Sequence, residues 1–95
     1  MLVRLAHGTA QPGRGGDLAA LLAQVSAILA GFDGCERYEV CRRPDAPDEV
    51  WVVERWRDAE AMRGSLELPA VRELLPRARE LMAEWAPAVD LEPLA

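Results

Sequence analysis

The segment Val50–Trp56 is the clearest strand in the sequence, and it carries a tryptophan on each of its two faces. Side chains alternate along a strand, so the residues divide into one face with Val50, Val52, Glu54 and Trp56 and another with Trp51, Val53 and Arg55. Each face holds a large aromatic side chain and at least one valine, which is not typical of a face open to water. We therefore expect helices on one face of the sheet and a second subunit on the other.

Three further segments are predicted to be strands: Met1–Ala10, Cys35–Arg42 and Val89–Leu94. Residues 43–48 contain two prolines and two aspartates, and they are predicted to form a hairpin-like, solvated connection to the strand at Val50. The last strand is flanked by prolines, which favours a position at a sheet edge.

A first helix is predicted over residues 18–32, where apolar side chains recur at spacings of three and four. Asp17 precedes the pattern and is predicted to be its N-cap. No charged residue lies between Asp17 and Asp33. A surface helix normally has a charged outer face, so this helix is expected to be covered on more than one side or to line a cavity.

Two helices are predicted after the strand at Val50. Asp58 is the expected N-cap of a short helix that ends near Leu66, and Pro69 suits the first turn of the next. Apolar spacing continues that helix to Trp85, which is expected to anchor its end to the core. Pro76 falls inside the pattern and is expected to kink or split the helix.

The order strand, helix, strand, strand, helix, strand predicts an α+β fold of the ferredoxin-like βαββαβ type, with an antiparallel sheet and helices on one face. Ninety-five residues are enough for one domain, 1–95. The uncovered sheet face, with Trp51 and Val53, would be an exposed apolar patch in a monomer. A homodimer through that face is the expected assembly.

Composition excludes several classes of function. The net charge of −5, from 16 acidic and 11 basic residues, argues against nucleic-acid binding. All basic residues except the single histidine are arginines, so lysine Schiff-base chemistry is excluded. The first ten residues do not resemble a secretory signal, and the weakly charged stretch 18–32 is shorter than the about 20 residues that span a bilayer. We expect a cytoplasmic protein with no membrane contact.

Neither cysteine is predicted to form a disulfide or a metal site. Cys35 and Cys41 lie in one predicted strand, about 20 Å apart at roughly 3.3 Å per residue, which is too far for a disulfide. With one histidine in the chain there is no Cys/His cluster for zinc, and no metal is expected.

Several short motifs occur in an order and spacing that resemble the antibiotic biosynthesis monooxygenase family of the dimeric α/β-barrel superfamily. They are Pro12-Gly13, Gly34-Cys35 with Tyr38, Pro44-Asp45-Ala46-Pro47-Asp48, Glu54-Arg55-Trp56 with Asp58, and Leu66 with Leu68-Pro69 before Val71-Arg72. The resemblance covers about residues 2–91. It implies a dimer with sheets packed face to face, and a pocket between each sheet and its helices. Many members oxidise phenols, quinols or polyketide anthrones with O₂, without metal or flavin.

Two departures from the family narrow what the resemblance implies. Many members have a histidine where Ser65 stands here, so no imidazole base is available at that position. The asparagine, tryptophan and histidine of the haem-degrading branch fall on Ala6, Trp56 and Leu75 in a gapless alignment, and only the tryptophan is present. Without the axial histidine, haem degradation is not expected.

Cofactor-free oxygenation needs a substrate anion held out of water, and therefore a base and a dry pocket. Trp56 is the first candidate, by stacking on a planar substrate and donating its N–H to an oxyanion. Tyr38 is a candidate phenolic donor. The candidate base is Glu54, whose pKa would rise on burial, or His7, because imidazole changes charge near neutral pH.

The sequence allows two orientations of His7. The His7 side chain lies in the pocket if the strand face that carries it packs against the helices. The gapless alignment instead places Ala6 toward the pocket and His7 toward the dimer interface. Each candidate also has a structural alternative: core packing for Trp56 and Tyr38, a Glu–Arg pair for Glu54, and a hydrogen bond to local backbone for Ser65. If Ser65 contacts the substrate instead, it would orient a hydroxyl group of the substrate. Val52 and Leu75 are the other expected lining residues of the pocket.

The function that these observations favour is a small cofactor-independent monooxygenase, an oxidoreductase that uses O₂ to oxidise a quinol or a polycyclic phenol of polyketide type. One alternative is an isomerase or cyclase, which would move protons in the same pocket without consuming O₂. The other is a dimer that binds a ligand without catalysis.

Overall fold

The computed structural model describes all 95 residues. In chain order the elements are β1 (Leu2–Ala10), α1 (Gly15–Leu29), β2 (Cys35–Arg43), β3 (Ala46–Trp56), α2 (Ala59–Ser65), α3 (Pro69–Glu80), β4 (Met82–Trp85) and β5 (Val89–Leu91). The sheet is antiparallel, with strand order β2-β3-β1-β4, and β5 also pairs with β1. This is the predicted ferredoxin-like arrangement, with a fifth short strand.

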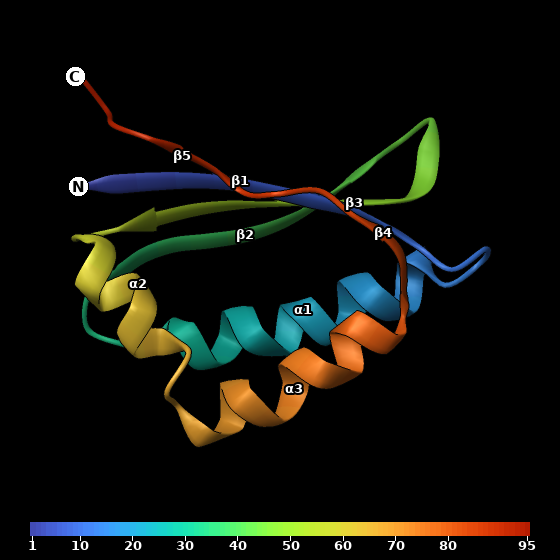
Figure 1. Cartoon of the computed structure of the whole chain (residues 1–95), viewed down its shortest axis with the longest axis horizontal. Coiled ribbons are helices and arrows are strands. Elements are labelled where there is room, and N and C mark those ends of the chain that lie inside the picture. The colour runs from blue at the N-terminus through green and yellow to red at the C-terminus, as the bar shows by residue number, and fades with distance from the viewer.

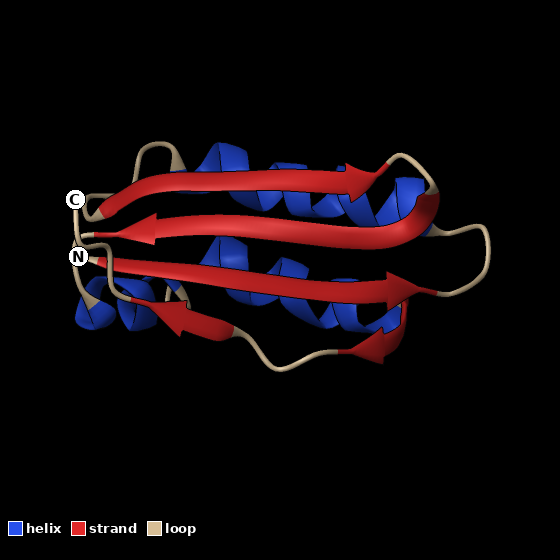
Figure 2. Cartoon of the chain, turned by 90° about the horizontal axis from the view of Figure 1, so that it is seen from above, coloured by secondary structure: helices blue, strands red, loops and turns tan.

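The three helices cover one face of the sheet (Figure 1). The other face is bare, so that the view from above shows the strands in front and the helices behind them (Figure 2). Strands β4 and β5 follow each other along one edge, beside β1 (Figure 2). No helix in the structure has the length and apolar character needed to cross a membrane.

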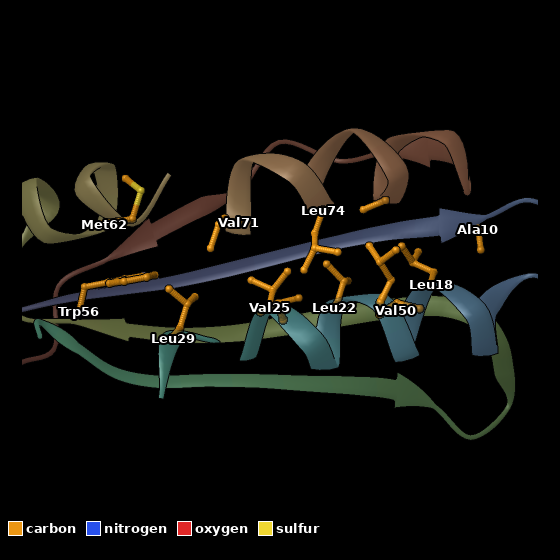
Figure 3. Packing of buried hydrophobic residues seen from close by; sticks show 13 residues of the cluster. Ala10, Leu18, Leu22, Val25, Leu29, Val50, Trp56, Met62, Val71 and Leu74 are labelled. Carbon is orange, nitrogen blue, oxygen red and sulfur yellow. The ribbon is translucent and has the colours of Figure 1, made fainter. Parts of the chain in front are cut away.

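The hydrophobic core lies between the sheet and α1 and α3. Val25 and Leu22 of α1 meet Val71 and Leu74 of α3 over the sheet, and Trp56 closes one end of this layer (Figure 3). The α1 residues are the apolar positions that the sequence indicated, and they are buried as expected. Helix α1 contacts both the sheet and α3, but these contacts do not cover its uncharged outer face, where Ala20, Ala23, Gln24 and Ala27 are exposed.

The start of α1 differs from the prediction. Asp17 is not the N-cap: it lies within the helix and pairs only with Arg14 in solvent. The carboxylate of Asp48, on β3, accepts hydrogen bonds from the backbone N–H groups of Gly13 (3.0 Å) and Gly15 (2.9 Å). A Cβ on Gly15 would collide with the Pro47 carbonyl oxygen, so glycine is required for this approach. The helix thus begins at Gly15, three residues earlier than expected, and ends at Leu29 rather than residue 32.

The connection between β2 and β3 is shorter than predicted. Arg42 and Arg43 belong to β2, β3 begins at Ala46, and only Pro44 and Asp45 lie between the strands. Asp48, expected in a solvated loop, instead holds the start of α1.

The C-terminal part of the chain departs most from the prediction. Helix α3 runs through Pro76 without a break and ends at Glu80, and the residues that continue the helical spacing form β4. Gln11 explains the change: its backbone N–H donates to the Leu81 carbonyl (2.8 Å) and its side-chain amide to the Met82 carbonyl (3.1 Å). Trp85 is therefore not a core anchor of a helix; it lies in β4 and is 64% exposed.

Other local predictions are confirmed. Asp58 caps α2 by accepting from the Ala61 N–H at 2.8 Å, and Pro69 opens α3. The last strand, β5, is shorter than predicted, and both cysteines are free.

Candidate active site

A cavity of about 260 Å³ lies between the sheet and the helices. Sixteen of its 22 lining residues are hydrophobic, and the charged side chains among the rest are Arg4, Glu54 and Arg79. Val52 and Leu75, expected as lining residues, both border it. Such a concave, mostly apolar space with a few polar groups is typical of a small-molecule site.

Four polar residues form a row across four strands on the helix side of the sheet. Tyr38 of β2 pairs with Glu54 of β3, Glu54 with Arg4 of β1, and Arg4 with Asp90 of β5. Paired residues of neighbouring strands point to the same face and lie close enough for their side chains to interact. Strand register therefore brings together residues that are far apart in the sequence.

Glu54 is the acidic group of the cavity. It is 9% exposed, and its Oε1 accepts a hydrogen bond from Nε1 of Trp56 at 3.0 Å. Burial raises the pKa of this carboxyl, and the hydrogen bond from Trp56 and the charge of Arg4 offset only part of that effect. A carboxylate of raised pKa in an apolar cavity is a stronger base than an exposed one.

Trp56 is 1% exposed and borders the cavity, as expected for a ring that stacks on a ligand or packs in the core. Its N–H is already engaged by Glu54, two residues earlier on the same face of β3. The expectation that this N–H donates to a substrate oxyanion is therefore not supported by the geometry.

Arg4 is held at the edge of the sheet by Asp90. Its Nε donates to Asp90 Oδ1 at 2.7 Å and its Nη2 to Oδ2 at 3.1 Å, a bidentate pair. The arginine lowers the pKa of Asp90 by this hydrogen bonding. Arg4 thus contributes positive charge beside Glu54 while its hydrogen bonds go to Asp90.

Tyr38 presents a protonated hydroxyl to the cavity. Burial, with the charge of Glu54 as a smaller cause, raises the pKa of Tyr38 well above its ordinary value. Its hydroxyl has no hydrogen bond within the protein, while its backbone carbonyl accepts from Ser26 Oγ at 2.7 Å, which ties β2 to α1. The phenol is therefore available as a donor to a ligand.

Ser65 also borders the cavity, and it is 2% exposed. Its hydroxyl donates to the backbone carbonyl of Met62 at 2.6 Å. This is the local backbone bond that the sequence allowed as one alternative, and it leaves the oxygen able only to accept from a ligand.

His7 borders the cavity from β1, but its side chain lies on the opposite face of the sheet from Glu54. It pairs with Trp51 across β1 and β3, and the two rings are stacked with centroids 4.2 Å apart and an interplanar angle of 15°. The alternative in which the His7 side chain enters the pocket is wrong, and the inward position on β1 belongs to Ala6, paired with Val52. Of the two candidate bases, only Glu54 is turned into the cavity.

Four residues of the site or its edge were not assigned to it from the sequence: Arg4, Asp90, Arg79 and Trp85. Arg4 and Asp90 join the site through strand register, which no local pattern encodes. Trp85 was assigned to the end of a helix. For Arg4 the sequence does contain one indication, because Arg4 is two residues before Ala6 and therefore shares the inward face of β1 with it.

The model of the family described as antibiotic biosynthesis monooxygenase matches residues 1–77 of this chain. No curated protein is similar enough in sequence to match.

Solved structures share the fold over nearly the whole chain. A provisional antibiotic biosynthesis monooxygenase from Chloroflexus aurantiacus is 28% identical, with a TM-score of 0.89 over 99% of this chain and 93% of that one. Rv0793 from Mycobacterium tuberculosis is 23% identical, with a TM-score of 0.87 over 99% and 95%. A mutant form of SnoaB, a cofactor-independent oxygenase from Streptomyces nogalater, is 18% identical, with a TM-score of 0.83 over 99% and 93%. At these identities the last two show a common fold.

Proposed function

Because this chain belongs to the antibiotic biosynthesis monooxygenase family, we propose that it is a monooxygenase that oxidises a quinol or a fused-ring phenol with O₂ and without a cofactor. The observation that carries the proposal is the buried Glu54, turned into an apolar cavity and hydrogen-bonded to Trp56. SnoaB, described as a cofactor-independent oxygenase, has the same fold and supports this reaction type.

The chemistry requires deprotonation first. Ground-state O₂ reacts poorly with closed-shell molecules, and a phenolate or enolate gives up an electron far more readily than the neutral phenol. In the proposed first step Glu54 takes the proton of the substrate hydroxyl. The raised pKa of Glu54 makes its carboxylate a better match for that proton. The apolar wall keeps water from competing for the anion.

In the next step the substrate anion transfers one electron to O₂, and the resulting radical pair combines to a peroxide anion at a ring carbon that carries a hydrogen; breaking of the C–H and O–O bonds then releases that hydrogen with the outer oxygen as hydroxide. This leaves a carbonyl at that carbon. One oxygen atom of O₂ enters the quinone product and the other leaves as water, with both hydrogens of that water supplied by the substrate. Glu54 returns the proton it took to the departing hydroxide.

Tyr38 and Trp56 have supporting roles in this proposal. The protonated phenol of Tyr38, opposite Glu54 in the strand register, would donate to a developing oxyanion. The Trp56 ring would stack on the planar substrate, and its N–H would keep the Glu54 carboxylate in place.

We further propose a homodimer through the bare sheet face. That face carries Val3 and Leu5 of β1, Trp51 and Val53 of β3, and Val89 and Leu91 of β5. Val89 and Leu91 are 54% and 44% exposed in the single chain. Together these side chains form an apolar patch, bordered on the same face by Arg37, Glu39 and Arg55, and such a patch is unusual in a stable monomer.

The test of the reaction is oxygen uptake by purified protein with a chelator and no added cofactor, over a panel of hydroquinones, naphthols and anthrones. Boiled protein and Glu54→Gln are the negative controls. Glu49→Gln is the matched variant, because Glu49 accepts the N–H of Trp51 as Glu54 accepts that of Trp56, but on the opposite face. Uptake that is lost in Glu54→Gln and kept in Glu49→Gln supports the proposal.

Substrate turnover without oxygen uptake would contradict the oxygenase and support the isomerase or cyclase that shares the pocket. Binding of the panel without turnover would support the non-catalytic alternative.

A further inference from the structure

The cavity has a buried acidic end and an exposed basic end. Glu54 is 9% exposed, whereas Arg79 and Trp85, which also line the cavity, are exposed at the surface. Arg79 lies in the last turn of α3 and Trp85 in β4, the next element in the chain. These two side chains, one cationic and one aromatic, mark the opening.

Arg79 has no partner within the protein. Most arginines of the chain are held in ion pairs, including Arg4, the other arginine of the cavity. Arg42, Arg63 and Arg77 also lack an ion pair, but none of them lines the cavity. Arg79 is therefore the one guanidinium free to pair with a group carried by a ligand in this space.

Trp85 is an unusual residue to leave exposed. Its exposed fraction is 64%, and it borders the cavity. Gly8, its partner on β1, leaves no side chain beside it, and a Cβ there would lie 3.0 Å from the Glu84 carbonyl oxygen. A flat ring and an unpaired guanidinium on the same cavity can hold a planar group that carries a negative charge.

We infer that Arg79 and Trp85 form a subsite at the mouth of the cavity that binds a carboxylate-bearing extension of the aromatic substrate. The inference rests on the proposed function, because it takes the cavity as the place where the phenol binds. It adds the substrate class: a fused-ring phenol with an acidic group at the end remote from the reacting hydroxyl.

Electrostatics sets the direction of such a ligand. A carboxylate is repelled by Glu54 and attracted by Arg79, whereas the charge of Arg4, beside Glu54, is offset by its pairing with Asp90. The phenolic hydroxyl can donate to Glu54. Gly8 of β1 pairs with Val50 on one side and with Trp85 on the other, so Val50 marks the position of Trp85 along β3. Glu54 lies four residues further along the same strand. At about 3.3 Å per residue this is about 13 Å, which suits an elongated ligand with different ends.

The experiment compares two probes by calorimetric titration at pH 7 and low salt: 6-hydroxy-2-naphthoate and 2-naphthol. The wild-type chain should bind the naphthoate about three- to tenfold more tightly, the range expected for a partly exposed charged hydrogen bond. Arg79→Gln should remove this preference, Arg79→Lys should keep part of it, and Arg77→Gln, on the same helix but outside the cavity, should keep all of it.

Two further readouts separate recognition from a structural effect. The preference should shrink in about 0.5 M NaCl, because salt screens an exposed ion pair. Trp85→Ala should weaken both probes about threefold or more through lost stacking. Unchanged melting temperatures show that each variant is folded.

Binding of 2-naphthol with no preference for the naphthoate, or a preference that survives in Arg79→Gln, would overturn the mouth subsite and leave the proposed function standing. Failure of both probes to bind would count against the proposed function and against this inference together. Unaltered binding in Trp85→Ala would overturn the role of the tryptophan, and with it the subsite as stated.

Discussion

Nε1 of Trp56 donates a hydrogen bond to Oε1 of Glu54 at 3.0 Å, and on the other face of the same strand Nε1 of Trp51 donates to Oε1 of Glu49 at 2.9 Å. The two pairs have the same spacing and opposite surroundings. Only Glu54 is buried in the cavity, and its pKa is raised by that burial. The two pairs therefore share the indole hydrogen bond and differ in burial, and Glu49 also pairs with Arg43 at 3.3 Å.

Replacing Glu54 by Gln should lower activity and raise stability. The base is lost, for which we expect a fall in kcat of about 100-fold or more. Burial raises the pKa of Glu54, so the folded state favours the protonated carboxyl. The stabilisation from this protonated form is fully present below the ordinary carboxyl pKa, and it is lost as the pH rises through the raised pKa of the folded state. Gln avoids this cost, so at pH 7 the variant should gain about 1 kcal/mol, or about 4–8 °C in Tm. The measurement is Tm at pH 4 and pH 7, with Glu49→Gln as the control. An unchanged Tm of Glu54→Gln at pH 7 would contradict the conclusion that burial of the Glu54 carboxylate costs stability.

Replacing Trp56 by Phe should move the acidic limb of the pH–rate profile to higher pH. The indole N–H lowers the pKa of Glu54, and phenylalanine has no donor, so the carboxyl should hold its proton to a higher pH. The measurement is kcat/KM against pH. Trp51→Phe, which removes the matching bond on the other face, should leave the limb where it is; equal shifts in both variants would count against a specific effect.

Replacing Asp90 by Asn should move the same limb the other way. Asp90 raises the pKa of Glu54 by its charge and also holds Arg4, whose charge lowers it. Asn removes the negative charge and weakens the hold on Arg4, so Glu54 should ionise at lower pH. The readout is again kcat/KM against pH, and a limb that stays in place would show that Asp90 is only a strand-edge contact.

The alternation of Val50–Trp56 predicted that Glu54 and Trp56 share a face of the sheet, because a period of two is a property of the strand itself. The row that joins Glu54 to Tyr38, Arg4 and Asp90 could not be predicted in this way. It depends on register between strands, which is a tertiary property. The orientation of His7 was settled by the same register.

The errors at the ends of α1 and α3 share one cause. Local spacing favoured Asp17 as a cap and a helix that continues to Trp85. Contacts from distant residues overrode both: Asp48 binds the N–H groups of Gly13 and Gly15, and Gln11 binds the carbonyls of Leu81 and Met82. A local sequence window cannot contain partners that lie so far apart along the chain.

The cap of α1 allows a direct comparison of the predicted and observed residues. Asp48→Ala should lower Tm by several degrees, because two N–H groups at the start of α1 lose their acceptor. Asp17→Ala should leave Tm nearly unchanged, since Asp17 forms only an exposed pair with Arg14. These hydrogen bonds lower the pKa of Asp48, so the stabilisation should be present at neutral pH and lost as the pH falls through the folded-state value. Equal effects of the two variants would contradict the observed cap.

The bare sheet face leads to a prediction about assembly. Light scattering should give a mass near twice 10.4 kDa for the wild-type chain. Leu5→Arg places a charge at the centre of the apolar patch, between Val53 and Val89 in the strand register, and should give a monomer, because an unpaired charge in an interface is costly to desolvate. Ala20→Arg adds the same charge on an exposed position of α1, on the helix side of the molecule, and should remain dimeric. A wild-type monomer, or a Leu5→Arg dimer, would show that this face does not bind a second copy. The stacked His7 and Trp51 would then be a surface feature of a single chain.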